Sequence, residues 1–367
     1  MRKRLLIILL LIAVQTGFAQ EKAPFSHNLW VRVDGHYGFI IPEYKHFNLL
    51  VNKPTQALEV SLFKRTTGKT DWEQLYKYPE YGLTLQYTSL GNNEILGHEI
   101  GIFPFVQSFI IRKPKFQFTH LFGLGLGYAT KRFDIETNYN NISVGSHLNI
   151  HFNFKLGTRF VLSPKWSFQS GLSFTHYSNA NMAEPNLGLN LFSAFAGISF
   201  AAGQQDDFKK TEITQHTPKH EFAFIYAAGG KHTRALQSTI YFTSSLSGEY
   251  KYHWKRKLHI GAGADFFYDS STKTEMQASK TAHKPIDDFR TGIHLSQELV
   301  YSKFSFILQE GMYLGLTDKV NNAKMYNRAI LRWKFTDNFL MSISMKSHLH
   351  ILDYPELGFG YFFVKKK

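Results

Sequence analysis

The sequence contains no cysteine, so no disulfide framework can hold its fold together. After the N-terminal region it has no apolar run of the roughly 20 residues that a membrane-spanning helix needs. It also lacks a glycine-rich phosphate loop, a G-x-S-x-G nucleophile elbow and an H-E-x-x-H zinc motif. We therefore expect neither a helical membrane anchor nor a bound metal ion or cofactor.

The N-terminal region has the three parts of a secretory signal peptide. Residues 2–4 are basic, residues 5–14 are apolar, and Gly17 and Ala19 supply the small side chains at the two positions that a signal peptidase reads. We expect cleavage after Ala19 and export of a mature chain that is held together by its core or its sheet.

The composition points to a membrane surface rather than to nucleic acid. The chain has 34 Phe and 19 Tyr, yet its mean hydropathy is slightly negative, a pairing typical of membrane β-barrels. Its net charge is +14, but the basic residues are scattered and form no nucleic-acid-binding motif. The positive charge is better suited to the anionic headgroups of outer-membrane lipids.

Stretches of alternating polar and apolar residues recur along the chain, and no helical period of comparable strength is present. About eight such stretches precede residue 201 and about eight follow residue 219, which is compatible with a sandwich, soluble repeats or a barrel. We divide the chain into a signal peptide (1–19), a first barrel half (20–203), a polar linker (204–219) and a second β-rich half (220–367).

The two faces of one predicted strand favour a membrane barrel. One face is apolar and the other carries small polar side chains, which suit a crowded barrel lumen better than a solvated sheet surface. The apolar face consists of Trp166, Phe168, Leu172 and Phe174, and the polar face of Ser167, Gln169, Gly171, Ser173 and Thr175. We therefore predict an all-β, antiparallel transmembrane β-barrel in the bacterial outer membrane.

The C-terminal pattern bears on the number of barrels. Gly358, Tyr361 and Phe363 form a G-x-x-aromatic-x-aromatic pattern that resembles the signal read by the barrel-insertion machinery. Because this pattern lies at the end of the whole chain rather than at the end of the first half, a single barrel of about 14–16 strands is slightly favoured. The alternative is an eight-stranded barrel followed by a second β-rich unit.

His176 and Ser178 are two residues apart at the end of that predicted strand, so their side chains share its lipid-facing side. A serine hydroxyl becomes an effective nucleophile when an adjacent imidazole accepts its proton. Such a pair also needs donors for an oxyanion, for which Asn179, Asn186 and the backbone N–H near Ala180 are candidates. With a periplasmic N-terminus, the seventh strand would carry the pair to the outer leaflet. A lipid is then the expected substrate.

The string His-Tyr-Ser-Asn-Ala at 176–180, with Asn-x-Gly at 186–188, resembles the PagL-type lipid A 3-O-deacylases, with weaker support from 145–149. The resemblance covers residues 28–200. It implies an eight-stranded outer-membrane barrel that removes an ester-linked acyl chain from the lipid A of lipopolysaccharide, without a metal or cofactor.

The resemblance also implies roles for individual residues. His176 corresponds to the catalytic base, Ser178 to the nucleophile and Asn186 to an oxyanion donor. The glutamate that completes the family's triad corresponds to Asn190, which can orient an imidazole but cannot stabilise an imidazolium as a carboxylate does. Glu184 is the nearest alternative acid in the sequence.

Two other functions remain open at this point. One is a barrel without enzymatic activity, such as a channel or structural protein, which the asparagine at position 190 would favour. The other is an assembly partner whose second half docks onto another envelope complex.

Further histidines carry weaker signals. His348 and His350, with Asp353 nearby, are interpreted as polar residues at a strand end rather than as a metal site, which needs another ligand. His147, Asn149 and His151 are interpreted as polar residues at the membrane interface.

Overall fold

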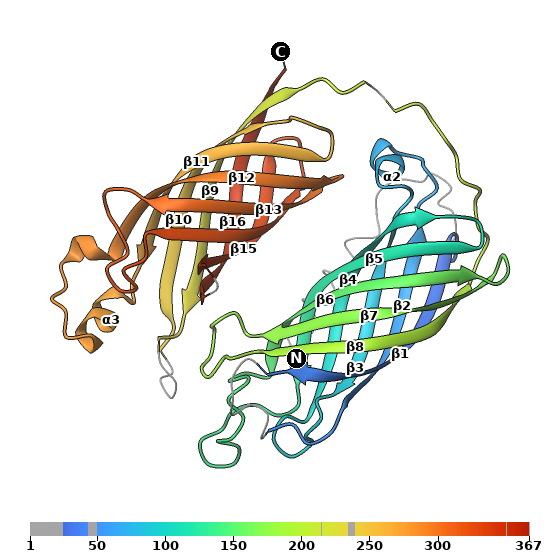
Figure 1. The fold of residues 1–367 in the computed structure, drawn as a ribbon. Helices are drawn as coiled ribbons and strands as arrows, with labels where there is room; N and C mark the ends of the chain where they lie inside the picture. Colours follow the sequence, from blue (N-terminus) through green and yellow to red (C-terminus); the bar gives the residue numbers. More distant parts are fainter. Residues whose placement is uncertain (1–24, 43–49, 214, 234–238, 350, 367) are drawn as a thin grey trace, which may run out of the picture.

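The structure is a computed structural model, which describes residues 25–42, 50–213, 215–233, 239–349 and 351–366. Within these ranges the chain forms sixteen strands in two closed antiparallel barrels (Figure 1). The predicted signal peptide lies outside the described residues. Among the helices that the structure describes, none is long and apolar enough to cross a membrane.

The first barrel is an eight-stranded meander in which each strand pairs with its neighbours in sequence. Its strands are β1 (Leu29–Ile41), β2 (Thr55–Arg65), β3 (Glu80–Ser89), β4 (His98–Arg112), β5 (Phe116–Ala129), β6 (Leu148–Val161), β7 (Trp166–Ser178) and β8 (Leu189–Ala201). The barrel closes where β8 pairs with β1, from Trp30 opposite Ala201 to Ile41 opposite Asn190. A short helix, α2 (Asp71–Leu75), lies between β2 and β3.

The second barrel repeats this plan. Its strands are β9 (Lys219–Lys231), β10 (Tyr241–Tyr252), β11 (Leu258–Asp269), β12 (Phe289–Tyr301), β13 (Phe304–Tyr313), β14 (Met325–Lys334), β15 (Phe339–His348) and β16 (Ile351–Lys366). It closes where β16 pairs with β9, with Glu356 opposite Gly229. Helices α3 (Thr272–Ala278) and η2 (Pro285–Asp288) lie in the connection between β11 and β12.

The all-β, antiparallel barrel predicted from the sequence is confirmed, and sixteen strands are within the predicted number. The preference for one large barrel is wrong. The strand β8 pairs with β1 rather than with β9, and β16 pairs with β9 rather than with β1. The chain therefore follows the alternative, an eight-stranded barrel followed by a second β unit, and that unit is itself a closed barrel.

Side chains alternate between the two sides of each barrel wall, as β geometry requires. On β7, Trp166, Phe168 and Leu172 are exposed on the outside, while Ser167 and Ser173 are buried in the lumen. The two faces predicted for this strand are confirmed. An exposed apolar exterior of this kind is what a hydrocarbon environment stabilises.

Both lumens are filled by buried ion pairs. In the first barrel, Arg159 donates to both carboxylate oxygens of Glu80 at 2.7 Å. In the second barrel, Lys251 donates to Glu298 at 2.8 Å, and Arg332 binds the carboxylate of Glu249. A buried charge is tolerated only when it is paired, so these contacts fix the lumen side chains in place.

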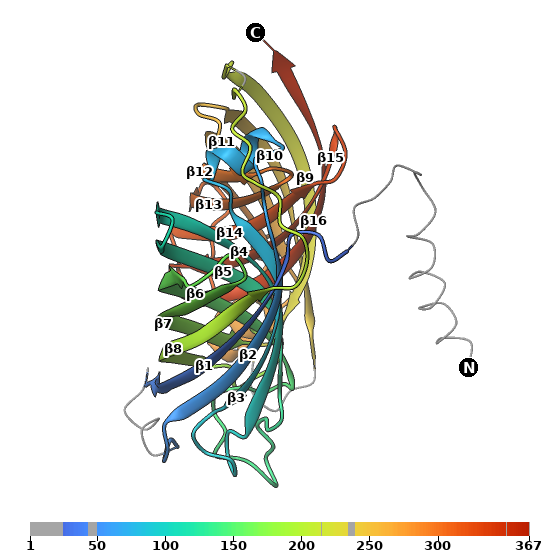
Figure 2. The ribbon, with the colours of Figure 1, turned by 90° about the vertical axis from the view of Figure 1, so that its right-hand side faces the viewer.

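The two ends of each barrel are here called the turn end, where most connections are short, and the loop end, where most connections are long. In the first barrel, the turn end carries residues 113–115 and 162–165, and the loop end carries residues 130–147 and 179–188. The two barrels lie side by side (Figures 1 and 2) and contact one another at both ends. At the turn end, the ring of Tyr76 stacks on Tyr301 with centroids 4.2 Å apart.

Candidate active site

The strand β7 delivers His176 and Ser178 to the loop end of the first barrel. Both side chains are half-buried on the outside of the wall. Thr175, which precedes His176, and Tyr177, which lies between His176 and Ser178, are buried in the lumen. His176 lies directly opposite Asn190 of β8 in the register of the two strands. The structure therefore brings together the three residues that the sequence suggested as a triad.

A continuous chain of hydrogen bonds joins these three side chains. The imidazole Nδ1 of His176 is 2.6 Å from Oδ1 of Asn190, and its Nε2 is 3.0 Å from Oγ of Ser178. An amide oxygen only accepts, so Nδ1–H donates to Asn190 and the lone pair of Nε2 faces the serine hydroxyl. This is the tautomer that a general base for Ser178 requires.

The connection after Ser178 is a tight turn with two consecutive residues of positive φ. Ala180 has φ 55° and Asn181 has φ 64°, and the N–H of Met182 donates to the carbonyl of Asn179 at 3.2 Å. Two positive φ values at the centre of a four-residue turn are typical of a type I′ turn, in which alanine is disfavoured. The backbone is therefore held in a conformation that its sequence does not prefer.

Asn179 and Asn186 shape this turn. The N–H of Asn179 donates to Oδ1 of Asn186 at 3.0 Å, which leaves the Nδ2 group of that amide as the donor. The side chain of Asn179 is buried and bonded to Ala183 and Met182, so it stabilises the turn. Within the part of the chain that the structure describes, no acceptor is bonded to the backbone N–H of Ala180. Asn186 and Ala180 therefore remain the candidate oxyanion donors, whereas Asn179 is engaged in the turn.

Gly188 packs closely against the imidazole. Its φ is +73°, and a Cβ added there would be 3.1 Å from Cε1 of His176 and 3.0 Å from the carbonyl oxygen of Tyr177. Its N–H donates to the carbonyl of Ser143 in the long β5–β6 connection at 2.9 Å. Only glycine meets both demands at this position.

An apolar groove of about 600 Å³ lies on the outside of the wall beside the site. It is lined by Tyr37 and Phe39 of β1, Leu172 of β7 and Phe192 and Ala194 of β8, with Lys53 at its margin. Leu172 and Phe192 belong to the same outward rows as His176 and Asn190. Reading the sequence did not identify this groove, because it depends on β1 closing against β8.

No carboxylate completes the triad within the described residues, where the hydrogen-bond partners of His176 are Asn190 and Ser178. Glu184, the alternative acid, lies in the β7–β8 connection. Burial raises the pKa of its carboxyl group. The hydrogen bond from the Asn186 N–H and the nearby His232 lower this pKa, but by less than burial raises it. The side chain that holds Nδ1 of His176 is therefore the amide of Asn190 rather than a carboxylate.

Asp34, His36 and Glu59 converge in the lumen of the first barrel with ligand atoms within 4.8 Å of one another. Lys155 already occupies this cluster, because its Nζ is 3.2 Å from Oδ2 of Asp34 and also binds Glu59. Arg32 binds the other oxygen of Glu59 at 3.2 Å. Two cations thus balance these carboxylates, and the donor set does not fit a metal ion.

The interpretation of residues 147–151 as polar side chains at the membrane interface is wrong for the last two. Asn149 and His151 are buried in the lumen, where Nδ1 of His151 is 3.1 Å from Glu99. The side chain of His147 bonds to the carbonyl of Ala129 at the start of the β5–β6 connection. His348 lies inside the second barrel, 3.2 Å from Asp318, and His350 lies outside the described residues.

Two family models match the chain, one on each barrel. Residues 56–199 match the lipid A 3-O-deacylase (PagL) model. Residues 220–366 match the model of the acyloxyacyl hydrolase C-terminal domain (PagL_C). No curated protein is significantly similar in sequence.

Two solved outer-membrane proteins align with less than half of this chain, which is about the length of one barrel. Neisserial surface protein A is 10% identical, with 47% of this chain and 97% of that chain covered and a TM-score of 0.34. The outer membrane enzyme PagL is 16% identical, with 45% of this chain and 97% of that chain covered and a TM-score of 0.33. Each of these two covers less than half of the present chain.

Proposed function

This chain belongs to the family of lipid A 3-O-deacylases (PagL), and on that premise we propose that it removes an ester-linked acyl chain from lipid A in the outer membrane. One observation carries the proposal: the hydrogen-bonded series Asn190–His176–Ser178 on the outside of a barrel wall. A nucleophile that faces lipid meets a substrate that is itself part of the membrane. The proposed reaction requires no metal or cofactor.

The groove supports a lipid substrate independently of the triad. Its volume lies in the range of small-molecule sites, and its lining is mostly apolar, with Asn52, Lys53 and Ser193 as the polar residues. An acyl chain lying along Leu172 and Phe192 would bring its ester group to Ser178 at the loop end. The ammonium of Lys53 suits a lipid A phosphate at the same level.

In the first step, Oγ of Ser178 attacks the ester carbonyl while Nε2 of His176 takes the hydroxyl proton. The carbonyl oxygen becomes an oxyanion, for which Nδ2 of Asn186 and the N–H of Ala180 are the available donors. The C–O bond to lipid A then breaks, and His176 returns the proton to the leaving alkoxide. The acyl chain is now an ester of Ser178.

In the second step, a water molecule gives a proton to His176 and attacks the acyl ester. Collapse of the second tetrahedral intermediate releases a free fatty acid and restores the Ser178 hydroxyl. Asn190 keeps Nδ1 protonated throughout, so that Nε2 serves as base and acid in turn. Because its amide carries no charge, the imidazolium is less stabilised than it would be beside a carboxylate.

The test is mass spectrometry of lipid A from cells that produce the wild type, Ser178→Ala or Ser170→Ala. Ser170 is on the same outward face of β7, but away from the triad, so its variant is the matched control. Lipid A that has lost one acyl chain is expected with the wild type and with Ser170→Ala. An identical acyl pattern in all three strains would contradict the proposal.

The channel alternative receives less support from the lumens. Lys155 and Arg159 in the first barrel are nearly fully buried and paired with carboxylates, so an ion would have to separate these pairs in order to pass. Conductance in planar bilayers that survives Ser178→Ala, with no change in lipid A, would favour a channel. A stoichiometric co-purifying protein would instead favour the assembly role.

A further inference from the structure

The second barrel is hydrogen-bonded to the turn that follows Ser178. Nδ2 of Asn181 donates to the main-chain carbonyl of Asp353 at 3.1 Å. The N–H of His232 donates to the main-chain carbonyl of Asn181 at 3.2 Å. Asp353 is near the start of β16 and His232 follows β9, and these are the two strands that close the second barrel. Asn181 is thus held through both its side chain and its main chain.

This contact holds the part of the turn that most needs support. Ala180 and Asn181 both have positive φ, a conformation that residues with a Cβ rarely adopt, and such conformations persist only where the surroundings impose them. Asn181 tolerates this conformation better than Ala180 does. Fixing Asn181 therefore restricts the conformation of the four-residue turn, which also contains the Ala180 N–H one peptide unit earlier.

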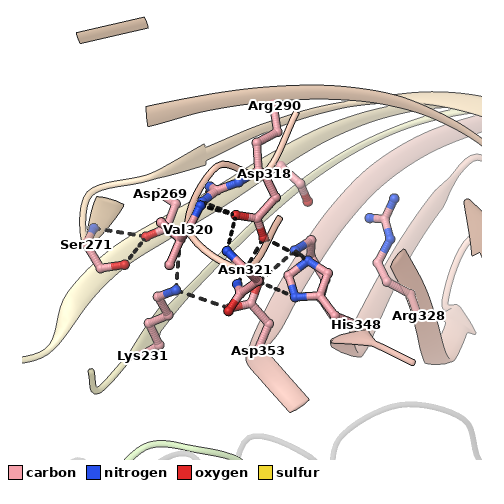
Figure 3. A network of polar contacts seen from close by, with 12 residues as sticks. Lys231, Asp269, Ser271, Arg290, Asp318, Val320, Asn321, Arg328, His348 and Asp353 are labelled. Carbon is pink, nitrogen blue, oxygen red and sulfur yellow. Dashed lines mark hydrogen bonds and ion pairs between the residues drawn. The ribbon is translucent and has the colours of Figure 1, made fainter. Parts of the chain in front are cut away.

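A network of buried ion pairs surrounds Asp353 at the loop end of the second barrel (Figure 3). This network holds the rim of the barrel, meaning the strand ends at its loop end, in a fixed arrangement. Nζ of Lys231 is 3.1 Å from Oδ1 of Asp353, 3.0 Å from Asp269 and 3.1 Å from Glu275. Nζ of Lys346 is 2.7 Å from Oδ2 of Asp353. Two ammonium groups thus hold Asp353, whose carbonyl receives the bond from Asn181.

The network continues across the loop end of the second barrel. Arg290 is 3.4 Å from carboxylate oxygens of both Asp269 and Asp318, and His348 is 3.2 Å from Asp318. Burial raises the pKa of Asp318, but the charge of Arg290 and the amide of Asn321 outweigh it, so that the net effect is a lowered pKa. The carboxylate at this position therefore stays ionised at neutral pH, and the rim is braced from β9 through β12 to β16.

Resting on the proposed deacylase function, we propose that the second barrel is a positioning unit for the oxyanion side of the active site. Lys231, Asp353 and His232 act through Asn181 to hold the Ala180 N–H where the oxyanion forms. The groove is lined by β1, β7, β8 and residues 51–54, all of the first barrel. Loss of the second-barrel contact therefore lowers kcat and leaves KM nearly unchanged.

Two buried lysines of the second barrel offer a matched pair of variants. Lys231 and Lys251 are both nearly fully buried and paired with carboxylates, but Lys251 pairs with Glu298 at 2.8 Å and does not belong to the rim network around Asp353. Removing one oxyanion donor costs roughly 10²–10³ in kcat, so a loosened donor in Lys231→Met should cost about tenfold. Lys251→Met should leave kcat within about twofold, and Lys231→Arg should restore most of the activity. Equal effects of the two methionine variants on kcat would overturn the positioning role.

A second set of variants acts at Asn181 itself and does not disturb the ion network. Asn181→Gly keeps a residue that accepts positive φ but removes the bond to Asp353, whereas Asn181→Ala loses both. Both are expected to lower kcat at constant KM, with the larger loss in Asn181→Ala. Wild-type kcat in Asn181→Gly would overturn the role assigned to the bond between Asn181 and Asp353.

The contact can also be measured without any activity. The full-length chain has no cysteine that could form a competing disulfide. The double variant Asn181→Cys, His232→Cys therefore places one cysteine on each barrel at the two positions whose main chains are hydrogen-bonded. An oxidised intramolecular disulfide, seen as a mobility shift that a reductant reverses, is expected, and its absence would contradict the contact. An inactive wild type would overturn the deacylase proposal itself, whereas an active wild type whose kcat is unchanged in both Asn181→Gly and Lys231→Met would overturn only the positioning role.

Discussion

Asn190→Asp is the substitution that examines the triad most closely, because it changes charge at nearly constant shape. The amide oxygen that lies 2.6 Å from Nδ1 of His176 becomes a carboxylate oxygen at the same place. The N–H donor on Nδ1 and the orientation of the ring are retained. What changes is the stabilisation of the imidazolium that forms when Ser178 is deprotonated.

The magnitude follows from the distance and the surroundings. Two unit charges about 4 Å apart interact by about 4 kcal/mol at an effective dielectric constant of about 20. His176 and Asn190 are only half-buried, so solvent and lipid headgroups screen much of this energy, and about 1–2 kcal/mol remains. We expect kcat to rise about tenfold in Asn190→Asp.

The assay is the release of free fatty acid from lipid A in mixed micelles by the purified full-length protein. Asn190→Ala is the companion variant, in which the ring loses its acceptor and kcat should fall about tenfold or more. A lower kcat in Asn190→Asp than in the wild type would refute the reasoning, since it would mean that the amide is not placed to support an imidazolium.

Four further predictions concern the surroundings of the site and the barrel walls. Gly188→Ala should cost about 1 kcal/mol of strain and lower kcat by displacing the imidazole, as measured by thermal unfolding and fatty acid release. Ala194→Phe should fill the groove and lower kcat/KM for long acyl chains about tenfold, while short-chain esters are still cleaved. Arg159→Met should leave Glu80 buried without its main partner and destabilise the first barrel by about 3–5 kcal/mol in urea titrations. Because the pKa of Asp318 is lowered in the fold, its contribution is present at neutral pH and is lost as pH falls below the unfolded value and through the folded value, so the stability difference between wild type and Asp318→Asn should shrink as the solution is acidified.

Local features of the fold were predictable because successive side chains of a β-strand point to opposite faces, so that the sequence alternates in the same way. The alternation of Trp166, Ser167 and Phe168 identified both the strand and its lipid-facing side. The two-residue spacing of His176 and Ser178 placed both side chains on one face of that strand. These inferences need only the neighbours of a residue along the chain.

Features that depend on pairing between distant strands were not predictable. Closure of β8 on β1 and of β16 on β9 brings together residues more than 100 positions apart, and no local pattern distinguishes it from one larger barrel. The groove between β1 and β8 and the contact of Asn181 with Asp353 follow from that closure and from the packing of two barrels. His151 was misplaced because its parity on β6 alone does not say which face is the lumen.

The central claim is that Ser178 cleaves an acyl ester of lipid A with the help of His176. Its most direct measurement is the mass of purified wild type and His176→Ala after brief reaction with lipid A and acid quenching, with the β7 peptide analysed for a bound acyl group. We predict an acyl ester on Ser178 and free fatty acid with the wild type, and neither with His176→Ala. An unmodified Ser178 in a wild type that still releases fatty acid, or no release at all, would contradict the account.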